Sequence, residues 1–340
     1  MAIRWKPHVS ISISDSSHAG EARRVAASLA TSIGLPSARA GELSIVVSEL
    51  ARNVVLHAGG GEIILAPWNM DKQAGVDVLA LDKGPGIENI GRSMEDGYST
   101  AGTPGNGMGA ITRLSDVFEI YSRFGHGTAA FVRAMAQREG AQGTGRFGAI
   151  CIPTKGESVC GDAWFCRSDV GRDTVMIADG LGHGPAANEA AEKAVAIMKK
   201  NPEATPVDFL TLAHEQLQDT RGAAVGVAEL DRQRGVVQYA GVGNIAGVIV
   251  GDQSIRSMVS MNGTVGHNAE RIQEFSYPCP PGSVLIMHSD GLTSRYNIEP
   301  YVGLMAHHPA LIAGVLYRDC KRGRDDATIV AIRNVRDAQG

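Results

Sequence analysis

The sequence lacks the features of disulfide-rich, membrane-spanning and nucleic-acid-binding proteins. Its 340 residues include five cysteines, an odd number without a Cys-x-x-Cys pair, so neither a disulfide framework nor a structural zinc site is indicated. The longest apolar run, Ala310–Tyr317, is far shorter than the ~18 residues of a membrane span. The net charge is only −4, with no large excess in either half, so we expect neither a nucleic-acid nor a membrane partner.

The N-terminus has no charged-then-apolar pattern of a signal peptide. Val9, Ile11 and Ile13 alternate with polar residues, which predicts a half-buried strand instead. With no export signal and no paired cysteines, the sequence favours a soluble protein of the reducing cytoplasm.

Composition and length indicate two globular domains. Hydrophobic residues make up 44% and charged residues 20%, as in ordinary globular proteins. At roughly 150 residues per domain the chain has room for about two. The segment 138–146 carries three glycines and no large apolar residue, which is typical of a linker. We therefore predict domains at 1–137 and 147–340.

Hydrophobic periodicity predicts mixed α/β structure in both halves, of α/β-sandwich (α+β) type rather than a parallel doubly wound sheet. In the first half we expect helices at about 41–58 and 107–115 and strands at about 76–81, 117–122 and 128–134. In the second half we expect helices at about 185–199 and 206–220 and strands at about 174–178, 223–230, 236–240, 246–250, 284–288 and 327–332.

The first half holds three short motifs suited to a nucleotide. Glu49 and Asn53, four residues apart, share one helix face, where a carboxylate and a carboxamide can orient a nucleophile and hold Mg²⁺. Asp82 ends an apolar strand and, as an acceptor only, suits the amine of adenine. The run Gly105-Asn-Gly-Met-Gly109 precedes a helix whose N–H groups would favour phosphate. Taken singly, each motif also fits a solvated face or an ordinary loop.

Together with Gly127-Thr128, these motifs resemble the GHKL ATPase/kinase superfamily across nearly all of 1–137. Ser48–Asn53 followed by His57-Ala-Gly is similar to the serine kinases of bacterial partner-switching systems, the RsbT type in particular. The resemblance implies a Bergerat α/β sandwich that binds ATP and Mg²⁺.

It also implies residue roles. Asn53 would ligate Mg²⁺, Glu49 would orient or deprotonate the attacking hydroxyl, and Asp82 would bind adenine. The implied nucleotide-binding set is completed by Gly84, Gly86, Gly105, Gly107, Gly109 and Thr128. The cation for the γ-phosphate stays open between Arg52, Lys83 and Arg92.

In the second half, four aspartates end or follow apolar strands. They are Asp162, Asp179, Asp290 and Asp325. Carboxylates gathered at strand ends repel each other unless cations lie between them, and oxygen-only ligands suit Mg²⁺ or Mn²⁺. Two such ions about 3.5–4 Å apart can activate a water and hold a phosphoryl oxygen. A single Asp-Gly pair would more simply be a turn.

The order of these aspartates resembles the PPM (type-2C) metal-dependent serine/threonine phosphatases, in the branch of SpoIIE and RsbX, across about 146–334. Ala178–Gly184 and Tyr239–Asn244 are characteristic of that branch. The resemblance implies a β-sandwich flanked by helices with two Mn²⁺ or Mg²⁺ ions. Asp179 would bridge the ions as the catalytic centre and Gly180 would offer its carbonyl. Asp162, Asp290 and Asp325 would complete the ligands, with Asp326 as a supporting acceptor.

Several positions depart from that pattern. Leu181 stands where many relatives have a general-acid His, and His183, two residues later, is either structural or a proton donor. Lys155 is the only base between Phe147 and Asp162, where relatives have a phosphate-binding Arg. The basic run Arg318–Arg324 is either a solvated loop or a means of attracting a phosphorylated partner.

These motifs predict a cytoplasmic switch protein with two opposed activities. An ATP-dependent serine kinase would phosphorylate STAS-domain antagonist proteins, and a PPM phosphatase would dephosphorylate them. In one alternative the first half is a nucleotide-binding regulatory module without kinase activity, fused to an active phosphatase. In another, the phosphatase half is only a scaffold. We also expect His307 and His308 to be exposed.

Overall fold

The computed structural model describes residues 2–5, 7–70, 73–93, 107–137, 144–252, 254–293 and 298–336. Contacts within the chain group it into two compact units. The first, here the N-terminal unit, comprises Arg4–Gly143 and Ala306–Arg318. The second, the C-terminal unit, comprises Met1–Ile3, Thr144–Met305 and Asp319–Gly340. The predicted linker falls mostly on 138–143, outside the described residues. The sequence did not anticipate that 306–318 would pack with the N-terminal unit.

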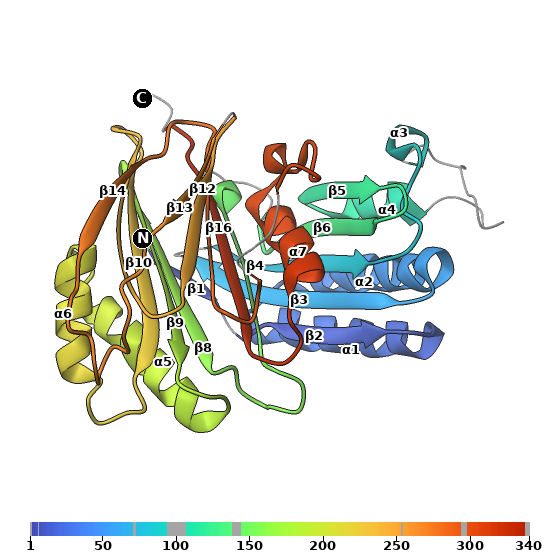
Figure 1. Cartoon of the computed structure of the whole chain (residues 1–340). Helices are drawn as coiled ribbons and strands as arrows, with labels where there is room; N and C mark the ends of the chain where they lie inside the picture. Colours follow the sequence, from blue (N-terminus) through green and yellow to red (C-terminus); the bar gives the residue numbers. More distant parts are fainter. Residues whose placement is uncertain are drawn as a thin grey trace. The chain divides into compact units, whose positions relative to one another are not determined.

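The N-terminal unit is an antiparallel sheet with two long helices on one face (Figure 1). Its strands are β1 (Ala2–Trp5), β2 (Val9–Ile13), β3 (Gly61–Met70), β4 (Gln73–Asp82), β5 (Val117–Arg123) and β6 (Gly127–Met135). Strands β1 and β2 both pair with β3, and the order continues β3-β4-β6-β5. Its helices are α1 (Ser16–Ser32), α2 (Ser37–Ala58), α3 (Ile90–Ser93) and α4 (Gly107–Leu114).

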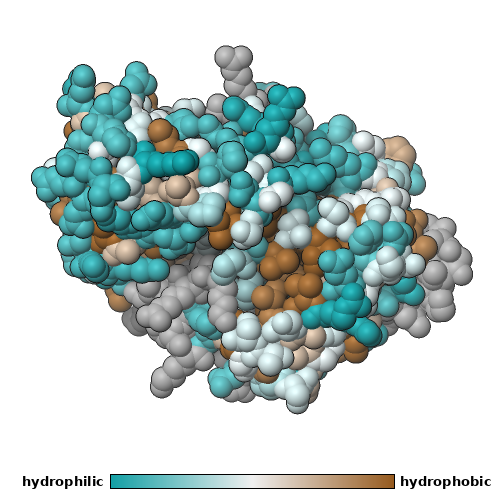
Figure 2. Space-filling view, turned by 90° about the horizontal axis from the view of Figure 1, so that it is seen from below, coloured by the Kyte–Doolittle hydropathy of each residue, from teal (hydrophilic) through white to brown (hydrophobic). Residues whose placement is uncertain are grey.

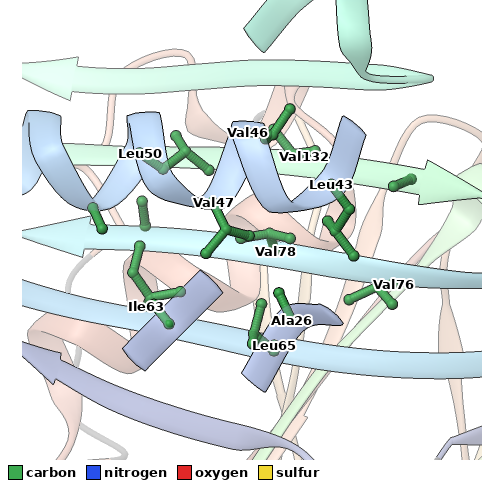
Figure 3. Close-up of a cluster of buried hydrophobic side chains, with 14 of the residues drawn as sticks. Ala26, Leu43, Val46, Val47, Leu50, Ile63, Leu65, Val76, Val78 and Val132 are labelled. Carbon is green, nitrogen blue, oxygen red and sulfur yellow. The ribbon is translucent and has the colours of Figure 1, made fainter. Parts of the chain in front are cut away.

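Helix α2 carries the apolar stripe expected from the sequence. Leu43, Val46, Val47 and Leu50 are buried and point toward the sheet, as Figure 3 shows. The helix ends at Gly59, whose φ of 69° is the left-handed conformation common after a helix. The predicted helix at 41–58 is thus confirmed, and it begins four residues earlier.

Helix α1 and strand β3 are among the elements of this unit that were not predicted. Helix α1 buries Ala22, Ala26 and Ala30, which share one face at four-residue spacing. Alanines give a weak hydrophobic stripe, so periodicity missed the helix. Strand β3 contains Pro67, and because proline cannot donate a backbone hydrogen bond, a segment that contains it is a poor candidate for a strand when the sequence is considered alone.

The other face of this sheet is covered by helix α7 (Pro309–Cys320) (Figure 1). A Cβ at Gly314 would lie 2.9 Å from Leu79 Cδ2 of β4, so the helix packs closely on that strand. His308 is buried and stacks on Phe131 at 4.5 Å between ring centroids, and His307 Nδ1 lies 3.0 Å from Glu119 Oε2. The expectation that both histidines are exposed is therefore wrong for His308, while His307 is half-buried, because the residues that precede α7 lie against β5 and β6.

The C-terminal unit contains two antiparallel sheets with helices flanking one of them (Figure 1). One sheet has the order β14-β11-β10-β9-β8, formed by Glu274–Pro278, Val236–Val242, Ala223–Asp231, Arg172–Gly180 and Asp162–Asp169. The other has the order β13-β12-β15-β16-β7, formed by Ile255–Met258, Ala246–Val250, Val284–His288, Ala327–Arg333 and Phe147–Ile152. Helices α5 (Pro185–Lys200) and α6 (Pro206–Gln216) pack against the first sheet. The predicted α/β architecture with flanking helices is confirmed.

Figure 2 shows one face of the molecule, on which hydrophilic residues surround a contiguous hydrophobic area. Among the described residues, no helix combines the length and apolar character needed to cross a membrane.

A buried ion pair in the N-terminal unit gives a first prediction. Arg133 of β6 donates two 2.7 Å hydrogen bonds to Asp77 of β4, and Trp68 Nε1 donates a third at 3.0 Å. Asp77→Ala would remove the carboxylate that pairs with this buried guanidinium, so we expect the free energy of unfolding to fall by about 3–5 kcal/mol. Urea unfolding followed by tryptophan fluorescence measures this loss. The paired change Asp77→Leu with Arg133→Met should cost much less, and equal losses would contradict the argument.

Candidate functional sites

The predicted acidic cluster forms at the ends of strands in the C-terminal unit. Asp162 opens β8 and Asp179 lies near the end of β9, and the two are direct partners across this antiparallel pair. Asp290 follows β15 and Asp325 precedes β16, which are also hydrogen-bonded neighbours. Asp162 is buried, Asp179 and Asp290 are half-buried, and Asp325 is exposed. Asp162 thus forms the buried end of this group of carboxyls, and Asp325 forms its solvent-exposed rim.

Polar neighbours hold these carboxyls in place. Ser289 Oγ donates to Asp162 Oδ2 at 2.6 Å, and Asn244 Nδ2 donates to Asp290 Oδ2 at 2.7 Å. Asp326 is buried, and its two oxygens accept from the backbone N–H groups of Thr154 and Gly161 at 2.8 and 2.9 Å. Asp326 is therefore occupied by the backbone, which leaves Asp325 as the adjacent carboxyl open to solvent.

Burial and mutual repulsion keep protons on this cluster in the metal-free protein. Burial raises the pKa of Asp162 to about 7. Burial and then the charges of Asp162 and Asp290 raise the pKa of Asp179 to about 9. Burial and the charge of Asp325 also raise the pKa of Asp290. Each carboxylate is costly without a positive charge nearby, so the cluster favours cations.

The donor set fits hard divalent cations. All predicted side-chain ligands are oxygens, and Asp162 Oδ1 is buried without a hydrogen-bond partner. Gly180 must be glycine, because a Cβ there would clash with the carbonyl oxygen of Ala187. Within the described ranges, no three His, Cys, Asp or Glu side chains are close enough to hold one metal ion. The carboxyls therefore form a loose cluster rather than a closed ligand set.

Two of the positions that depart from the phosphatase pattern lie on the loop after β9. Leu181 is 50% exposed, and its hydrocarbon side chain offers the cluster no proton donor. His183 is exposed, and its Nδ1 lies 2.6 Å from Glu157 Oε1. This pair ties two loops together, which favours a structural role for His183.

The N-terminal unit brings Glu49, Asn53 and the start of α4 together. A Cβ at Gly107 would lie 2.9 Å from Glu49 Oε2 and 4.0 Å from Asn53 Oδ1. The N–H groups of the first turn of α4 therefore lie beside the polar face of α2. Arg52 Nη2 pairs with Glu49 Oε2 at 2.6 Å, which puts one candidate γ-phosphate cation next to the candidate base.

Asp82 is fixed by the backbone around it. Its Oδ1 accepts from the N–H groups of Gly84 and Thr128 at 2.9 and 3.1 Å. Its Oδ2 is left to accept a further donor. Burial raises the pKa of Asp82, while the two backbone bonds act in the opposite direction. Arg318 Nη1 donates to the carbonyl of Asp82 at 3.0 Å, so α7 supports the end of β4 from the other side of the sheet.

The other predicted nucleotide residues surround Asp82 or lie in α4. A Cβ at Gly84 would lie 2.6 Å from Ala58 Cβ, so only glycine lets this loop pass the end of α2. Gly86 lies in the same loop, and Thr128 Oγ1 lies 2.9 Å from Ser122 Oγ. Gly109 is in α4. Gly105 and the side chain of Arg92 lie outside the described residues.

Sequence reasoning missed the partners that hold the sites together. Ser289 directly precedes Asp290, and Asn244 directly follows Gly243 at the end of the segment Tyr239–Asn244. Their polar side chains at these positions were the signal that could have identified them. Arg318 carried no such signal, because its contact with Asp82 joins residues 236 positions apart.

Two protein families match the chain. Residues 13–133 match the histidine kinase-like ATPase domain, and residues 169–335 match the family described as Stage II sporulation protein E (SpoIIE). The chain is 37% identical over 107 residues to serine/threonine-protein kinase RsbT of Bacillus subtilis (strain 168). That match covers 32% of this chain and 80% of RsbT.

Further matches concern a phosphatase and a solved structure. The chain is 24% identical over 140 residues to phosphoserine phosphatase RsbX of Bacillus subtilis (strain 168), covering 41% of this chain and 70% of RsbX. It also resembles a solved structure described as "The bacterial stressosome: a modular system that has been adapted to control secondary messenger signaling". There the TM-score is 0.52 and the identity 28%, with 55% of this chain and 98% of that chain covered.

The hydrogen bonds of Asp82 predict how a substitution separates adenine binding from folding. Asp82→Asn keeps Oδ1 as acceptor for Gly84 and Thr128 but turns the position of Oδ2 into a donor, which would oppose the amine of adenine. We expect ADP affinity to fall about 10- to 100-fold, with little change in Tm. Calorimetric titration with ADP checks this. Wild-type affinity in the variant would contradict the role of Asp82.

The raised pKa values of Asp162 and Asp179 predict a pH-dependent stability of the metal-free protein. A carboxyl whose pKa is higher folded than unfolded, where it is about 4, binds more protons in the folded state. The unfolding free energy should therefore fall as pH rises toward the folded pKa values of about 7 and about 9. We expect Tm in chelator to decrease from pH 6 to 9.

Two controls sharpen this test. Asp179→Asn should flatten the decrease, and Mn²⁺ should oppose it by neutralising the carboxylates. A Tm that rises over this range, or an unchanged slope in Asp179→Asn, would contradict the electrostatic account.

Proposed function

Since the chain belongs to the histidine kinase-like ATPase family of RsbT through its N-terminal part and to the SpoIIE family of PPM phosphatases through its C-terminal part, we propose that it is a bifunctional switch enzyme. One part transfers phosphate from ATP to serine or threonine of a partner protein, and the other removes it. The observation that carries the proposal is the pairing of Asp162 with Asp179 at one end of a sheet, beside Asp290 and Asp325.

In the phosphatase part, Asp162, Asp179, Asp290, Asp325 and the carbonyl of Gly180 would hold two Mn²⁺ or Mg²⁺ ions. Such ions, when bound, polarise phosphoryl oxygens and activate a water. The water oxygen would bond to phosphorus as the bond from phosphorus to the serine oxygen breaks. A proton from the water would end on the serine oxygen, which gives phosphate and the free hydroxyl. Ser289 and Asn244 keep Asp162 and Asp290 oriented through their hydrogen bonds.

In the kinase part, ATP would lie between α2, the loop after β4 and α4. Asp82 Oδ2 would accept from the adenine amine, Asn53 would ligate Mg²⁺, and the first turn of α4 would face the phosphates. Glu49 orients the attacking hydroxyl and takes its proton as the γ-phosphoryl group leaves ADP. Phosphoryl transfer depends mainly on such positioning and charge neutralisation.

We propose STAS-domain antagonist proteins as the shared substrate. RsbT and RsbX are a kinase and a phosphatase by name, and their likenesses occur here in one chain. Joining two opposed activities raises the effective concentration of each toward a common partner. The phosphorylation state of the partner would then follow the balance of ATP binding and divalent-ion binding. We place this activity in the cytoplasm, without nucleic acid or membrane partners.

A second candidate is a regulatory nucleotide-binding module joined to an active phosphatase. The ion pair between Arg52 and Glu49 favours it, because it engages the carboxylate that a kinase would use as base. In that case the N-terminal unit binds ATP without transferring phosphate.

Matched variants separate these functions. With a STAS-domain protein and ATP radiolabelled in its γ-phosphate, we expect label transfer by the wild type and a loss of at least ~100-fold in Asn53→Ala. Asp179→Asn should keep transfer but lose Mn²⁺-dependent release of phosphate by a similar factor. ATP binding without transfer would establish the second candidate, and release unaffected by Asp179→Asn would refute the phosphatase site.

A further inference from the structure

The carboxyl cluster described above is acidic, and the proposed phosphatase site needs a cation for the substrate phosphate. Between Phe147 and Asp162 the chain has one basic residue, Lys155, which is exposed. A phosphoryl group brings two negative charges to a cluster that is already acidic. An arginine is suited to offset them, because its planar fork can donate two parallel hydrogen bonds to a phosphate.

The loop after α7 is held against the loop that carries Asp290. The backbone N–H of Arg322 donates to the carbonyl of Gly291 at 2.8 Å, and Thr293 N donates to the carbonyl of Cys320 at 3.0 Å. Lys321 and Leu292 form a β-bridge between these two contacts. The basic run is therefore pinned beside Asp290 rather than being a free solvated loop.

The three basic residues of the loop, Lys321, Arg322 and Arg324, differ in their effect on Asp290. Arg322 is the base whose charge acts on Asp290 and on buried His288, whereas Lys321 and Arg324 are not among the charges that act on them. The side chain of Arg322 is exposed, and no other described residue forms an ion pair with it. It is thus close to the cluster and accessible to a protein substrate.

Arg221 is the competing candidate among the described residues. A Cβ at Gly182 would lie 3.3 Å from its Nη1, so it covers the loop after Asp179. The charge of Arg322 acts on Asp290, whereas that of Arg221 is not among the charges that act there.

We propose that Arg322 binds the phosphoryl group of the substrate at the rim of the carboxyl cluster. It would supply a cation from the loop after α7, on the side of the cluster that carries Asp290. This inference rests on the proposed phosphatase function. The substrate class is a phosphoserine or phosphothreonine displayed on a protein surface, where an exposed guanidinium can meet it.

The test compares Arg322→Ala with Arg324→Ala, which removes the same charge from the same loop. The full chain in Mn²⁺ is titrated with inorganic phosphate by calorimetry. We expect Arg322→Ala to weaken phosphate binding on the order of 10- to 100-fold, Arg324→Ala to change it less than about two-fold, and Arg322→Lys to recover part of the loss. Equal effects of the two alanine variants would overturn the proposal.

Two further measurements show whether Arg322→Ala disturbs the metal site and whether the proposed phosphatase function holds. Mn²⁺ affinity should be the same in Arg322→Ala as in wild type, and a parallel loss of Mn²⁺ binding would overturn the proposed contact with phosphate. With p-nitrophenyl phosphate as substrate, Arg322→Ala should raise KM more than it lowers kcat. If the wild type binds phosphate through Arg322 but hydrolyses neither p-nitrophenyl phosphate nor a phosphoserine peptide, the phosphatase function fails while the binding role of Arg322 stands.

Discussion

Electrostatic repulsion among buried carboxyl groups is the constraint on which the C-terminal unit depends. Antiparallel pairing puts Asp162 directly opposite Asp179, and the second sheet adds Asp290 and Asp325. Hydrogen bonds from Ser289 and Asn244 offset only part of the cost, since Asp162 Oδ1 has no partner among the described residues. A fold that tolerates this arrangement must be stable enough elsewhere, and the many buried apolar side chains of its sheets provide that stability.

The N-terminal unit solves a different electrostatic problem. Its acidic residue Asp82 is bound by backbone N–H groups, so one carboxylate is oriented without a cation. The proposed phosphate region beside Asn53 would instead rely on neutral amides and on the start of a helix. A nucleotide site would need donors for its phosphates and a metal site would need acceptors, and the two units differ in this way.

Most of helix α7 packs with a unit of the structure that is distant from it in the sequence. By sequence it belongs with the second half, yet Ala306–Arg318 pack with the N-terminal unit. Leu311, Ile312, Val315 and Leu316 are all fully buried, so the helix is apolar around most of its circumference. Tyr317 Oη donates to Glu62 and Arg318 donates to the carbonyl of Asp82, which anchors the helix to β3 and β4.

The sequence by itself determined the elements with strong periodicity and the residue types of both sites. The stripe of α2 and the strands Ala246–Val250 and Val284–His288 follow from local patterns, because burial of one face sets their spacing. The tertiary structure alone decided which carboxyl of the pair Asp325-Asp326 is open, that His308 is buried, and that Arg322 lies beside Asp290. Those outcomes depend on contacts between segments far apart in the chain, and local periodicity carries no information about such contacts.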